Sequence, residues 1–398
     1  MRLGRFHANA PVCSPTRAAL LTSRYPDLVG VPGVIRTHPE DSWGYLAPRA
    51  TLLPRVLKGA GYHTACVGKW HLGLEGPDRP EARGFDTFRG FLGDMMDDYT
   101  THRRHGRNYL RRDGREVDPE GHATDLFTAW GIEYLEERKH DARPFFLYLA
   151  YNAPHAPIQP PTAWLERVRR REPGLDDRRA RLVALIEHLD DGIGRVLGAL
   201  RANGQAGETL VIFTSDNGGQ LDLGARCGPV RGGKGDLYEG GLRVPMSAAW
   251  PGRIAPGAHS DRVALTMDLH PTLCAAAGVP PGPEVDGVSL LPTLLGRGDP
   301  EPADRDLFWM RREGGPRYGG RDYFAVRRGD WKLMQNGPFE PYRLYHLAAD
   351  PLEAHDRSAG EPAVVAALSR ALRGHIRRAG AVPWQAPPRP AEGEGPAR

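Results

Sequence analysis

Cys13-Ser14-Pro15-Thr16-Arg17, followed by Ala-Ala-Leu-Leu-Thr at residues 18–22, opens a predicted helix. Pro15 suits the first helical turn, where its missing N–H costs no hydrogen bond, and residues 18–21 propagate a helix well. Cys13 is therefore expected at or just before the N-terminus of this helix, where free N–H groups and the helix dipole favour an anion. Arg17 lies one turn further along and is expected to reach back. A thiol, a positive helix end and a guanidinium thus converge on one point.

Apolar strands alternate with helical stretches through most of the chain. The patterns predict helices at residues 51–60, 124–139 and 176–203, and strands at residues 62–67, 145–151, 209–214 and 244–249. The run at 145–151 is continuously apolar and aromatic, which predicts a strand buried on both faces. The alternation predicts an α/β fold with a large, mostly parallel sheet and helices on both of its faces.

Polar residues follow several of these strands directly. In open α/β sheets, ligands bind beyond the carboxyl ends of the strands, so side chains at these ends are expected to meet in one site. The residues placed there by the pattern are Lys69, His71, His155, Asp216 and Asn217. A further glycine-rich segment, Arg231-Gly232-Gly233-Lys234-Gly235, would let backbone N–H groups approach an anion.

The pattern of predicted secondary structure changes near residue 300. Short strands at 323–326, 331–334 and 343–347, followed by a helix at 361–378, predict a small antiparallel sheet with one helix. We therefore predict three parts: a catalytic α/β domain over residues 1–300, a small α+β subdomain over 301–382, and a disordered tail over 383–398, which is rich in Pro, Ala, Glu and Gly.

Composition excludes several classes of protein. The net charge of +4 over 398 residues does not argue for nucleic-acid binding, and the arginine-rich stretches at 103–115 and 167–181 are expected to be solvated faces. No run approaches the length of a membrane span, and no signal peptide is predicted. The four cysteines lack metal-ligand spacing, and Cys66 and Cys274 read as small core residues.

The pattern Cys-x-Pro-x-Arg at residues 13–17 resembles the signature of the type I sulfatases, in the alkaline phosphatase superfamily. Gly68-Lys69-Trp70-His71-Leu72-Gly73, the loop around His155, Ser215-Asp216-Asn217-Gly218 and the segment around Lys234 resemble further blocks of that family, in family order. Softer matches follow at residues 84–86, 286–291 and 329–333. The resemblance covers almost the whole chain and implies an alkaline-phosphatase-like fold.

The resemblance also implies roles for these residues. Cys13 would be oxidised to Cα-formylglycine by a formylglycine-generating enzyme, and a hydroxyl of the hydrated aldehyde would attack sulfur. Lys69 and Lys234 would bind the sulfate, and Arg17 is counted with them among the catalytic residues. His71 would take a proton from the second hydroxyl, and His155 would be the general acid or a contact of the leaving oxygen.

A divalent metal is implied as well. Asp216 and Asn217 offer hard oxygen ligands that suit Ca²⁺ or Mg²⁺, with residue 13 as a further ligand. Family members begin with a strand that ends in paired aspartates, and no such strand precedes Met1-Arg2 in this sequence. We expect about 25–40 residues to be lacking. The pair Asp97-Asp98 lies out of family order, so we do not assign to it the role of the paired aspartates.

A misassigned start is the favoured explanation of that gap, and a genuine truncation with poor activity is the other. The leading hypothesis is hydrolysis of an aryl or carbohydrate sulfate, of a small molecule or a glycan, without a nucleic-acid or membrane partner. The alternatives are a phosphonate monoester or phosphodiester hydrolase of the same superfamily and an inactive homologue. The sequence places the protein in the periplasm or outside the cell if an export signal precedes it, and otherwise in the cytoplasm. Specificity is expected in the loops at 94–115 and 220–232.

Overall fold

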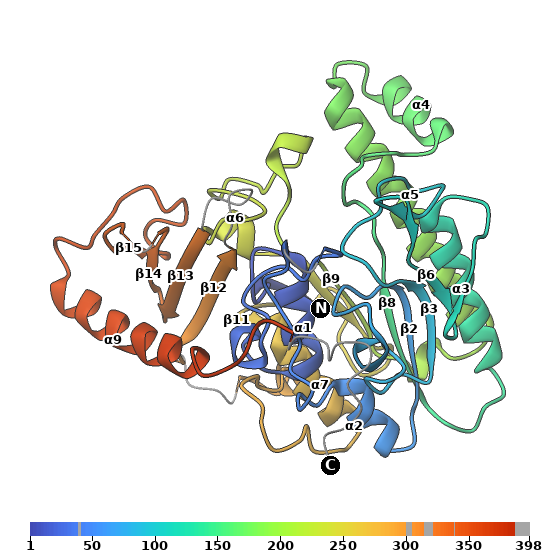
Figure 1. The fold of residues 1–398 in the computed structure, drawn as a ribbon, viewed down its shortest axis with the longest axis horizontal. Helices are drawn as coiled ribbons and strands as arrows, with labels where there is room; N and C mark the ends of the chain where they lie inside the picture. The colour runs from blue at the N-terminus through green and yellow to red at the C-terminus, as the bar shows by residue number, and fades with distance from the viewer. Residues whose placement is uncertain (39–40, 300–304, 314–320, 338, 387–398) are drawn as a thin grey trace, which may run out of the picture.

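The computed structural model describes residues 1–38, 41–299, 305–313, 321–337 and 339–386 (Figure 1). Its α-helices are α1 (Cys13–Thr22), α2 (Leu53–Gly59), α3 (Ala123–Glu137), α4 (Thr162–Arg171), α5 (Asp177–Ala202), α6 (Glu239–Leu242), α7 (Leu269–Ala276), α8 (Leu291–Leu294) and α9 (Pro362–Ala379). None of the helices in these ranges is long and apolar enough to span a membrane.

The strands form two sheets in the region predicted to be catalytic. The first has the order β11 (His259–Leu265), β1 (Arg2–His7), β10 (Met246–Ala249), β9 (Val211–Thr214). The second has the order β7 (Arg115–Glu116), β6 (Leu110–Arg112), β3 (Thr87–Phe91), β2 (His63–Lys69), β8 (Phe145–Ala150). A small hairpin, β4 (Arg103–Arg104) with β5 (Arg107–Asn108), stands apart.

Strand directions are mixed rather than uniform. β1 runs parallel to β11, and β2 runs parallel to both β3 and β8. In contrast, β10 is antiparallel to both of its neighbours, and β3 and β6 are antiparallel to each other. The α/β prediction is confirmed, but the single sheet that we expected is divided between β8 and β9. The opening strand β1 was not predicted from the pattern.

Successive side chains of a strand point to opposite faces of the sheet, and helices cover both faces of the second sheet. Cys66 packs in one cluster with Ala18 and Leu21 of α1, whereas Val67 packs on the other face with Phe127 of α3. Cys66 and Cys274 are both fully buried and free, as expected for small core residues.

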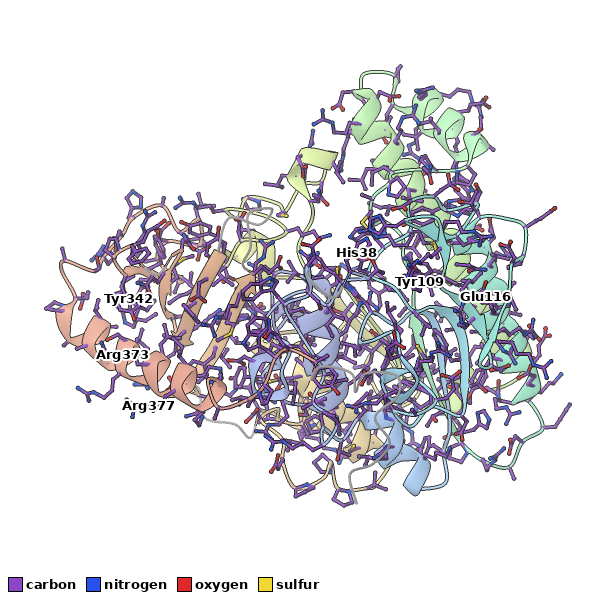
Figure 2. The ribbon with its side chains drawn as sticks, viewed as in Figure 1. His38, Tyr109, Glu116, Tyr342, Arg373 and Arg377 are labelled. Carbon is purple, nitrogen blue, oxygen red and sulfur yellow. The ribbon has the colours of Figure 1, made fainter. Side chains whose placement is uncertain are left out.

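The C-terminal sheet is antiparallel, as predicted. Its order is β12 (Leu307–Glu313), β13 (Arg321–Arg328), β14 (Trp331–Gln335), β15 (Arg343–His346). Helix α9 packs on it through Leu368 and Leu372, and Figure 2 shows Arg373 and Arg377 on its solvent side. The predicted boundary at 300/301 and residues 387–398 of the predicted tail lie outside the described residues, so the domain division stays a prediction.

Three segments have surroundings that the sequence pattern did not predict. The strand at 145–151 is not buried on both faces: residues 145–149 of β8 are only half-buried, because the outer edge of this strand meets no neighbouring strand in the described structure. Asp97 and Asp98 have structural partners, since Asp97 pairs with Arg104 and Asp98 accepts hydrogen bonds from the Thr100 and Thr101 amides. The arginine-rich stretch 103–115 is likewise ion-paired rather than merely solvated, with Arg104 also bound to Asp94.

A buried charge cluster joins the C-terminal sheet to the rest of the molecule. Lys332 of β14 lies 3.1 Å from a carboxylate oxygen of Glu239 on α6 and 2.8 Å from one of Glu353. His7 of β1 contacts the other Glu239 oxygen at 2.9 Å. Burial alone would raise the Glu239 pKa, but Lys332 and His7 hold this pKa well below its usual range. Lys332 thus compensates two carboxylates that have little access to water.

Replacing this lysine should destabilise the protein strongly. We expect Lys332→Met to lower the free energy of unfolding by about 3–5 kcal/mol, because two carboxylates would stay buried without their cation. Urea unfolding followed by circular dichroism would measure it. The matched control is Lys58→Met, whose 52%-exposed lysine pairs with Asp86 and should cost under about 1 kcal/mol. Equal losses in the two variants would contradict the role given to the cluster.

Candidate active site

Cys13 is the first residue of α1 and lies at the wall of a large cavity. Its side chain is buried, and the Val12 N-cap supplies no side-chain cap in the described structure. The local fold is tightened by Thr16, whose hydroxyl oxygen accepts from the Ala10 amide and whose hydroxyl donates to the Ala10 carbonyl. The free N–H groups at a helix N-terminus favour an anion, and Cys13 at this end lines the cavity.

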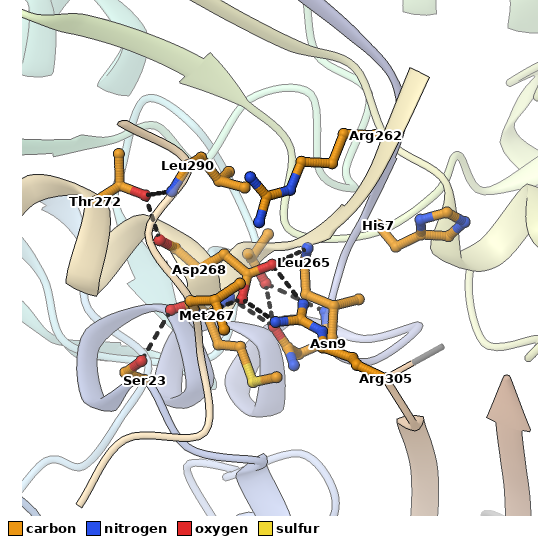
Figure 3. A network of polar contacts seen from close by, with 12 residues as sticks. His7, Asn9, Ser23, Arg262, Leu265, Met267, Asp268, Thr272, Leu290 and Arg305 are labelled. Atoms are coloured by element: carbon orange, nitrogen blue, oxygen red, sulfur yellow. Dashed lines mark hydrogen bonds and ion pairs between the residues drawn. The ribbon is translucent and has the colours of Figure 1, made fainter. Parts of the chain in front are cut away.

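A buried polar network holds the loop between β1 and α1 (Figure 3). The Asn9 side-chain oxygen accepts from the Thr266 hydroxyl at 2.7 Å and from the Met267 amide at 2.8 Å. Asp268, which is fully buried, accepts from the Leu265 amide and pairs with Arg305 at 2.7 Å. The network fixes η6 (Thr266–Asp268) against the loop, so the position of Cys13 depends on residues more than 250 positions away.

The Arg17 guanidinium contacts residues from three strands or from the segments that follow them. Nη2 and Nε bind one oxygen of Asp216 at 2.9 and 3.0 Å, and Nη1 donates to the Lys69 carbonyl at 2.8 Å. Nη1 also lies 3.4 Å from the Tyr148 hydroxyl. Burial opposes the charged form, but Tyr148, Asp216 and Cys13 raise the Arg17 pKa above its ordinary value. Arg17 is a permanent buried cation.

Lys69 and His71 come from the end of β2 and the turn after it, as predicted. Burial, together with nearby Arg17 and Lys234, lowers the Lys69 pKa, although Cys13 and Asp216 oppose that shift. His71 adopts a left-handed backbone conformation, with φ of 63°, which directs the chain sharply out of the strand. Burial first, and then the charge of Lys69 and Arg17, hold the His71 pKa well below its usual range.

The hydrogen bonds of His71 identify its tautomer. Nε2 lies 2.7 Å from the Ile35 carbonyl oxygen, which can only accept, so Nε2 carries the proton. Nδ1 is buried and has no hydrogen-bond partner among the described residues. His71 therefore offers an unprotonated nitrogen that is ready to accept a proton.

His155 and Lys234 meet although 79 residues separate them in sequence. His155 Nδ1 donates to the Ala156 carbonyl at 2.8 Å, so Nε2 is the acceptor and receives a hydrogen bond from the Lys234 ammonium at 2.9 Å. Burial, Lys69 and Lys234 hold the His155 pKa well below its usual range. In this state the proton between the two residues belongs to Lys234.

Asp216 and Asn217 follow β9 and complete the group. Asn217 Oδ1 accepts a hydrogen bond from Cys13 Sγ at 3.5 Å. Burial would raise the Asp216 pKa, but Arg17, Lys69 and Lys234 lower it below the ordinary value. All eight residues predicted for the site, Cys13, Arg17, Lys69, His71, His155, Asp216, Asn217 and Lys234, are thus linked by contacts or by mutual charge effects.

Tyr148 was missed by sequence reasoning. Its hydroxyl reaches Arg17 from the middle of β8, and burial raises its pKa to about 12, so it stays neutral. The signal was weak, because one phenol in a run of apolar residues reads as a packing residue.

The candidate metal ligands are few. Asp216 already binds Arg17, and Asn217 faces Cys13. Within the described part of the chain, the group of three or more His, Cys, Asp or Glu that could hold an ion is His122, Asp125 and His188, none of which was predicted. Asp125 pairs with His188 at 3.1 Å, and His122 accepts from the Thr124 amide, so a structural role explains both contacts.

Comparison with known proteins agrees with this geometry. The Sulfatase family profile matches residues 1–279, and the profile of the C-terminal region of N-sulphoglucosamine sulphohydrolase matches residues 233–378. N-acetylgalactosamine-6-sulfatase of Sus scrofa is 35% identical over 350 residues, which are 82% of this chain and 63% of that protein. Arylsulfatase A of Homo sapiens is 32% identical over 427 residues, which are 94% of this chain and 79% of that protein. The chain thus spans less than two thirds of the N-acetylgalactosamine-6-sulfatase that it matches.

Solved structures show the same fold. Ps i-CgsB in complex with k-i-k-neocarrahexaose superimposes with a TM-score of 0.85 at 28% identity, covering 95% of this chain and 85% of that chain. BT4656, in complex with its substrate D-glucosamine-2-N,6-O-disulfate, has a TM-score of 0.72 at 21% identity and supports the fold alone; it covers 95% of this chain and 90% of that chain. The profile match over most of the chain, the curated relatives and the shared fold together establish that this chain belongs to the sulfatase family.

Proposed function

We propose that the chain hydrolyses an aryl or carbohydrate sulfate ester, with residue 13 as the nucleophile. The observation that carries the proposal is the placement of Cys13 at the start of α1, against Asn217 and beside buried or half-buried cations. When oxidised to Cα-formylglycine, residue 13 would supply a hydrated aldehyde with a hydroxyl that attacks sulfur. The helix end around it is suited to an anionic substrate.

The charge of the site favours a sulfate group. The site holds three cationic groups, from Arg17, Lys69 and Lys234. The Asp216 carboxylate interacts electrostatically with all three. Because Arg17 is occupied by Asp216, we assign Lys69 and Lys234 to direct sulfate contacts and Arg17 to positioning. Donors in a site with little water stabilise developing charge far better than they would in bulk water.

We infer separate proton roles for the two histidines. His71 Nδ1 is unprotonated and unpartnered among the described residues, so it suits the base that removes a proton near residue 13. His155 Nε2 holds no proton, but it is bonded to the Lys234 ammonium. The leaving oxygen would therefore receive its proton from the Lys234–His155 pair, rather than from an imidazolium that exists beforehand.

The residues described do not by themselves make a calcium site. Ca²⁺ takes six to eight oxygen ligands, whereas this site offers the Asp216 carboxylate, one oxygen of which is bound to Arg17, and the Asn217 amide oxygen. Asp216, Asn217 and residue 13 stay our proposed ligands for Ca²⁺ or Mg²⁺, but further oxygens must come from elsewhere.

Relatives suggest the class of ester. Two relatives are an N-acetylgalactosamine-6-sulfatase and an arylsulfatase A, one named for a sugar sulfate and the other for an aryl sulfate. We therefore keep both aryl and carbohydrate sulfates as substrates of this chain. The phosphonate or phosphodiester alternative rests on the same oxidised cysteine, which hydrolases of that kind in the superfamily use, and on the shared tetrahedral shape of the two anions.

The first test addresses Cys13. When the protein is coexpressed with a formylglycine-generating enzyme, the peptide that contains residue 13 should be lighter than the same peptide with cysteine. It should also react with a carbonyl probe, and mass spectrometry would detect both changes. Cys13→Ala should abolish turnover of 4-nitrophenyl sulfate and leave the circular dichroism spectrum unchanged. Cys227→Ala, at a half-buried free cysteine in the wall of the same cavity, is the matched control and should keep activity. Turnover by Cys13→Ala would refute the nucleophile.

The second test separates the ester classes. The matured protein should turn over 4-nitrophenyl sulfate faster than a phenylphosphonate monoester, because a sulfate ester presents three terminal oxygens to the cationic groups, whereas a phosphonate monoester presents two and has a phenyl carbon in place of the third. Side-by-side measurement of kcat/KM for the two esters decides it. A higher kcat/KM for the phosphonate would move the assignment to the alternative hydrolase, and no turnover of either would favour the inactive homologue.

The third test uses the two depressed histidine pKa values. An unfolded histidine binds a proton below about pH 6.5, whereas folded His71 and His155 resist protonation. Stability should therefore fall as the pH drops from 7.5 to 5.5, by up to about 1.4 kcal/mol per pH unit for each histidine. In urea unfolding, His71→Gln and His155→Gln should each show a shallower pH dependence than the parent. His259→Gln, at an exposed histidine, should not. An unchanged slope in all variants would contradict the buried neutral forms.

A further inference from the structure

The residue that fixes the tautomer of His71 also contacts the start of α1. The Ile35 carbonyl accepts a hydrogen bond from His71 Nε2 at 2.7 Å, and the Ile35 backbone N–H donates to the Ser14 hydroxyl oxygen at 3.1 Å. Ser14 follows Cys13 directly in α1, and the three bonded residues are all buried. One residue thus joins the helix that carries the candidate nucleophile to the candidate base.

The Ile35 carbonyl decides where the single proton of neutral His71 lies. The hydrogen bond that one ring nitrogen makes selects between the two tautomers of an imidazole, and a carbonyl oxygen can only accept. The proton therefore lies on Nε2, and Nδ1, which has no hydrogen-bond partner among the described residues, keeps its lone pair. Any movement of Ile35 away from His71 would remove this preference and let the Nε2 proton exchange with water.

Ile35 lies in two backbone segments, residues 30–36 and 43–45, which together we call the Ile35 loop. Neither segment contains a helix or a strand in the described structure. Backbone hydrogen bonds join the two segments, from Gly33 to the Trp43 carbonyl, from Trp43 to the Val34 carbonyl and from Tyr45 to the Gly30 carbonyl. Because the loop is not part of a sheet, its place beside His71 depends on contacts with other parts of the chain.

The C-terminal sheet supplies the first of these contacts. The Arg312 amide of β12 donates to the Pro32 carbonyl at 2.9 Å. The Arg36 guanidinium pairs at 2.8 Å with the Glu313 carboxylate, which is fully buried. A carboxylate without access to water needs such a partner, so β12 holds the residue that directly follows Ile35.

The segment after α9 supplies a second support (Figure 1). Trp384 stacks on Trp43 of the loop, with ring centroids 4.4 Å apart and an angle of 10° between the ring planes. The Pro383 carbonyl approaches Gly30 so closely that a Cβ at residue 30 would lie 2.6 Å from its oxygen. Gly30 also has a φ of 82°, which favours glycine. The segment after α9 is thus packed tightly on the Ile35 loop, although hundreds of residues separate the two in sequence.

We propose that Trp384 is a positioning residue for the candidate active site. It acts through its stacking on Trp43, which holds the Ile35 loop, and the loop in turn holds the proton of His71 on Nε2. The inference rests on the proposed role of His71 as the base, because a base needs the open Nδ1 that this arrangement leaves. It gives the C-terminal part of the chain a share in placing a proton within the site.

The test observes the His71 proton directly. The 398-residue chain is labelled with nitrogen-15 histidine, and the NMR signal that disappears in His71→Gln is assigned to His71. In the parent, this signal should show a proton on Nε2 that exchanges slowly with water. Trp384→Ala should speed the exchange by about two- to tenfold, the change that loss of one aromatic pair implies.

Two further variants and one internal reference separate positioning from a general loss of stability. Trp384→Phe keeps a ring on Trp43 and should restore most of the slow exchange. Trp331→Ala is the matched control, because it also removes a half-buried tryptophan of the C-terminal part, one that packs against His346; it should leave the exchange of the His71 proton unchanged. The backbone amides of β2 report the stability of the whole fold, and Trp384→Ala should speed their exchange less than that of the His71 proton.

Several results would overturn the inference. Equal exchange of the His71 proton in the parent and in Trp384→Ala would remove the positioning role, and so would equal acceleration by Trp331→Ala or equal acceleration of the β2 amides. A proton found on Nδ1 in the parent would contradict the tautomer on which the inference depends. The measurements need neither maturation of Cys13 nor turnover of an ester, so a failure of the proposed function is distinguishable from a failure of this inference.

Discussion

The buried guanidinium of Arg17 is the contact on which the site depends. It reaches the Lys69 carbonyl at the end of β2, the Tyr148 hydroxyl on β8 and the Asp216 carboxylate after β9, and so it joins the two half-sheets across their gap. A guanidinium suits this task because its planar fork supplies several donors in fixed directions and stays charged when buried. The same contacts support our proposal that Arg17 positions the site and that the lysines contact the sulfate.

Charge and proton placement in the site follow from burial beside cations. Lys69 and Lys234 favour an anion, and the same charges keep His71 and His155 neutral. A neutral His71 with an open Nδ1 is a base, while the proton of the other pair lies on Lys234. An arriving sulfate would partly cancel the cationic charge, and the opposite charge would favour protonated histidine. Binding and proton transfer are therefore coupled through one electrostatic field.

The open edges of β8 and β9 and the short set of metal ligands both occur at the cavity beside the site. β8 and β9 are central-strand sequences with edge-strand exposure, and the cavity between them opens on the cationic end of the site. Hydrogen bonding explains the first aspect, because each edge has unused backbone groups. Electrostatics explains the second, because Asp216 is shared among three cations.

Much of the site could be predicted from the sequence. Short-range patterns identified α1 with Cys13 at its start, the strands before Lys69, His155 and Asp216, and the antiparallel C-terminal sheet, because hydrophobic period and turn residues are local properties. The division of the sheet, the tautomer of His71, the Lys234–His155 bond and the bridging role of Arg17 were decided only by the tertiary structure. These depend on which groups meet across hundreds of residues and on how far water is excluded, and neither is encoded in local periodicity.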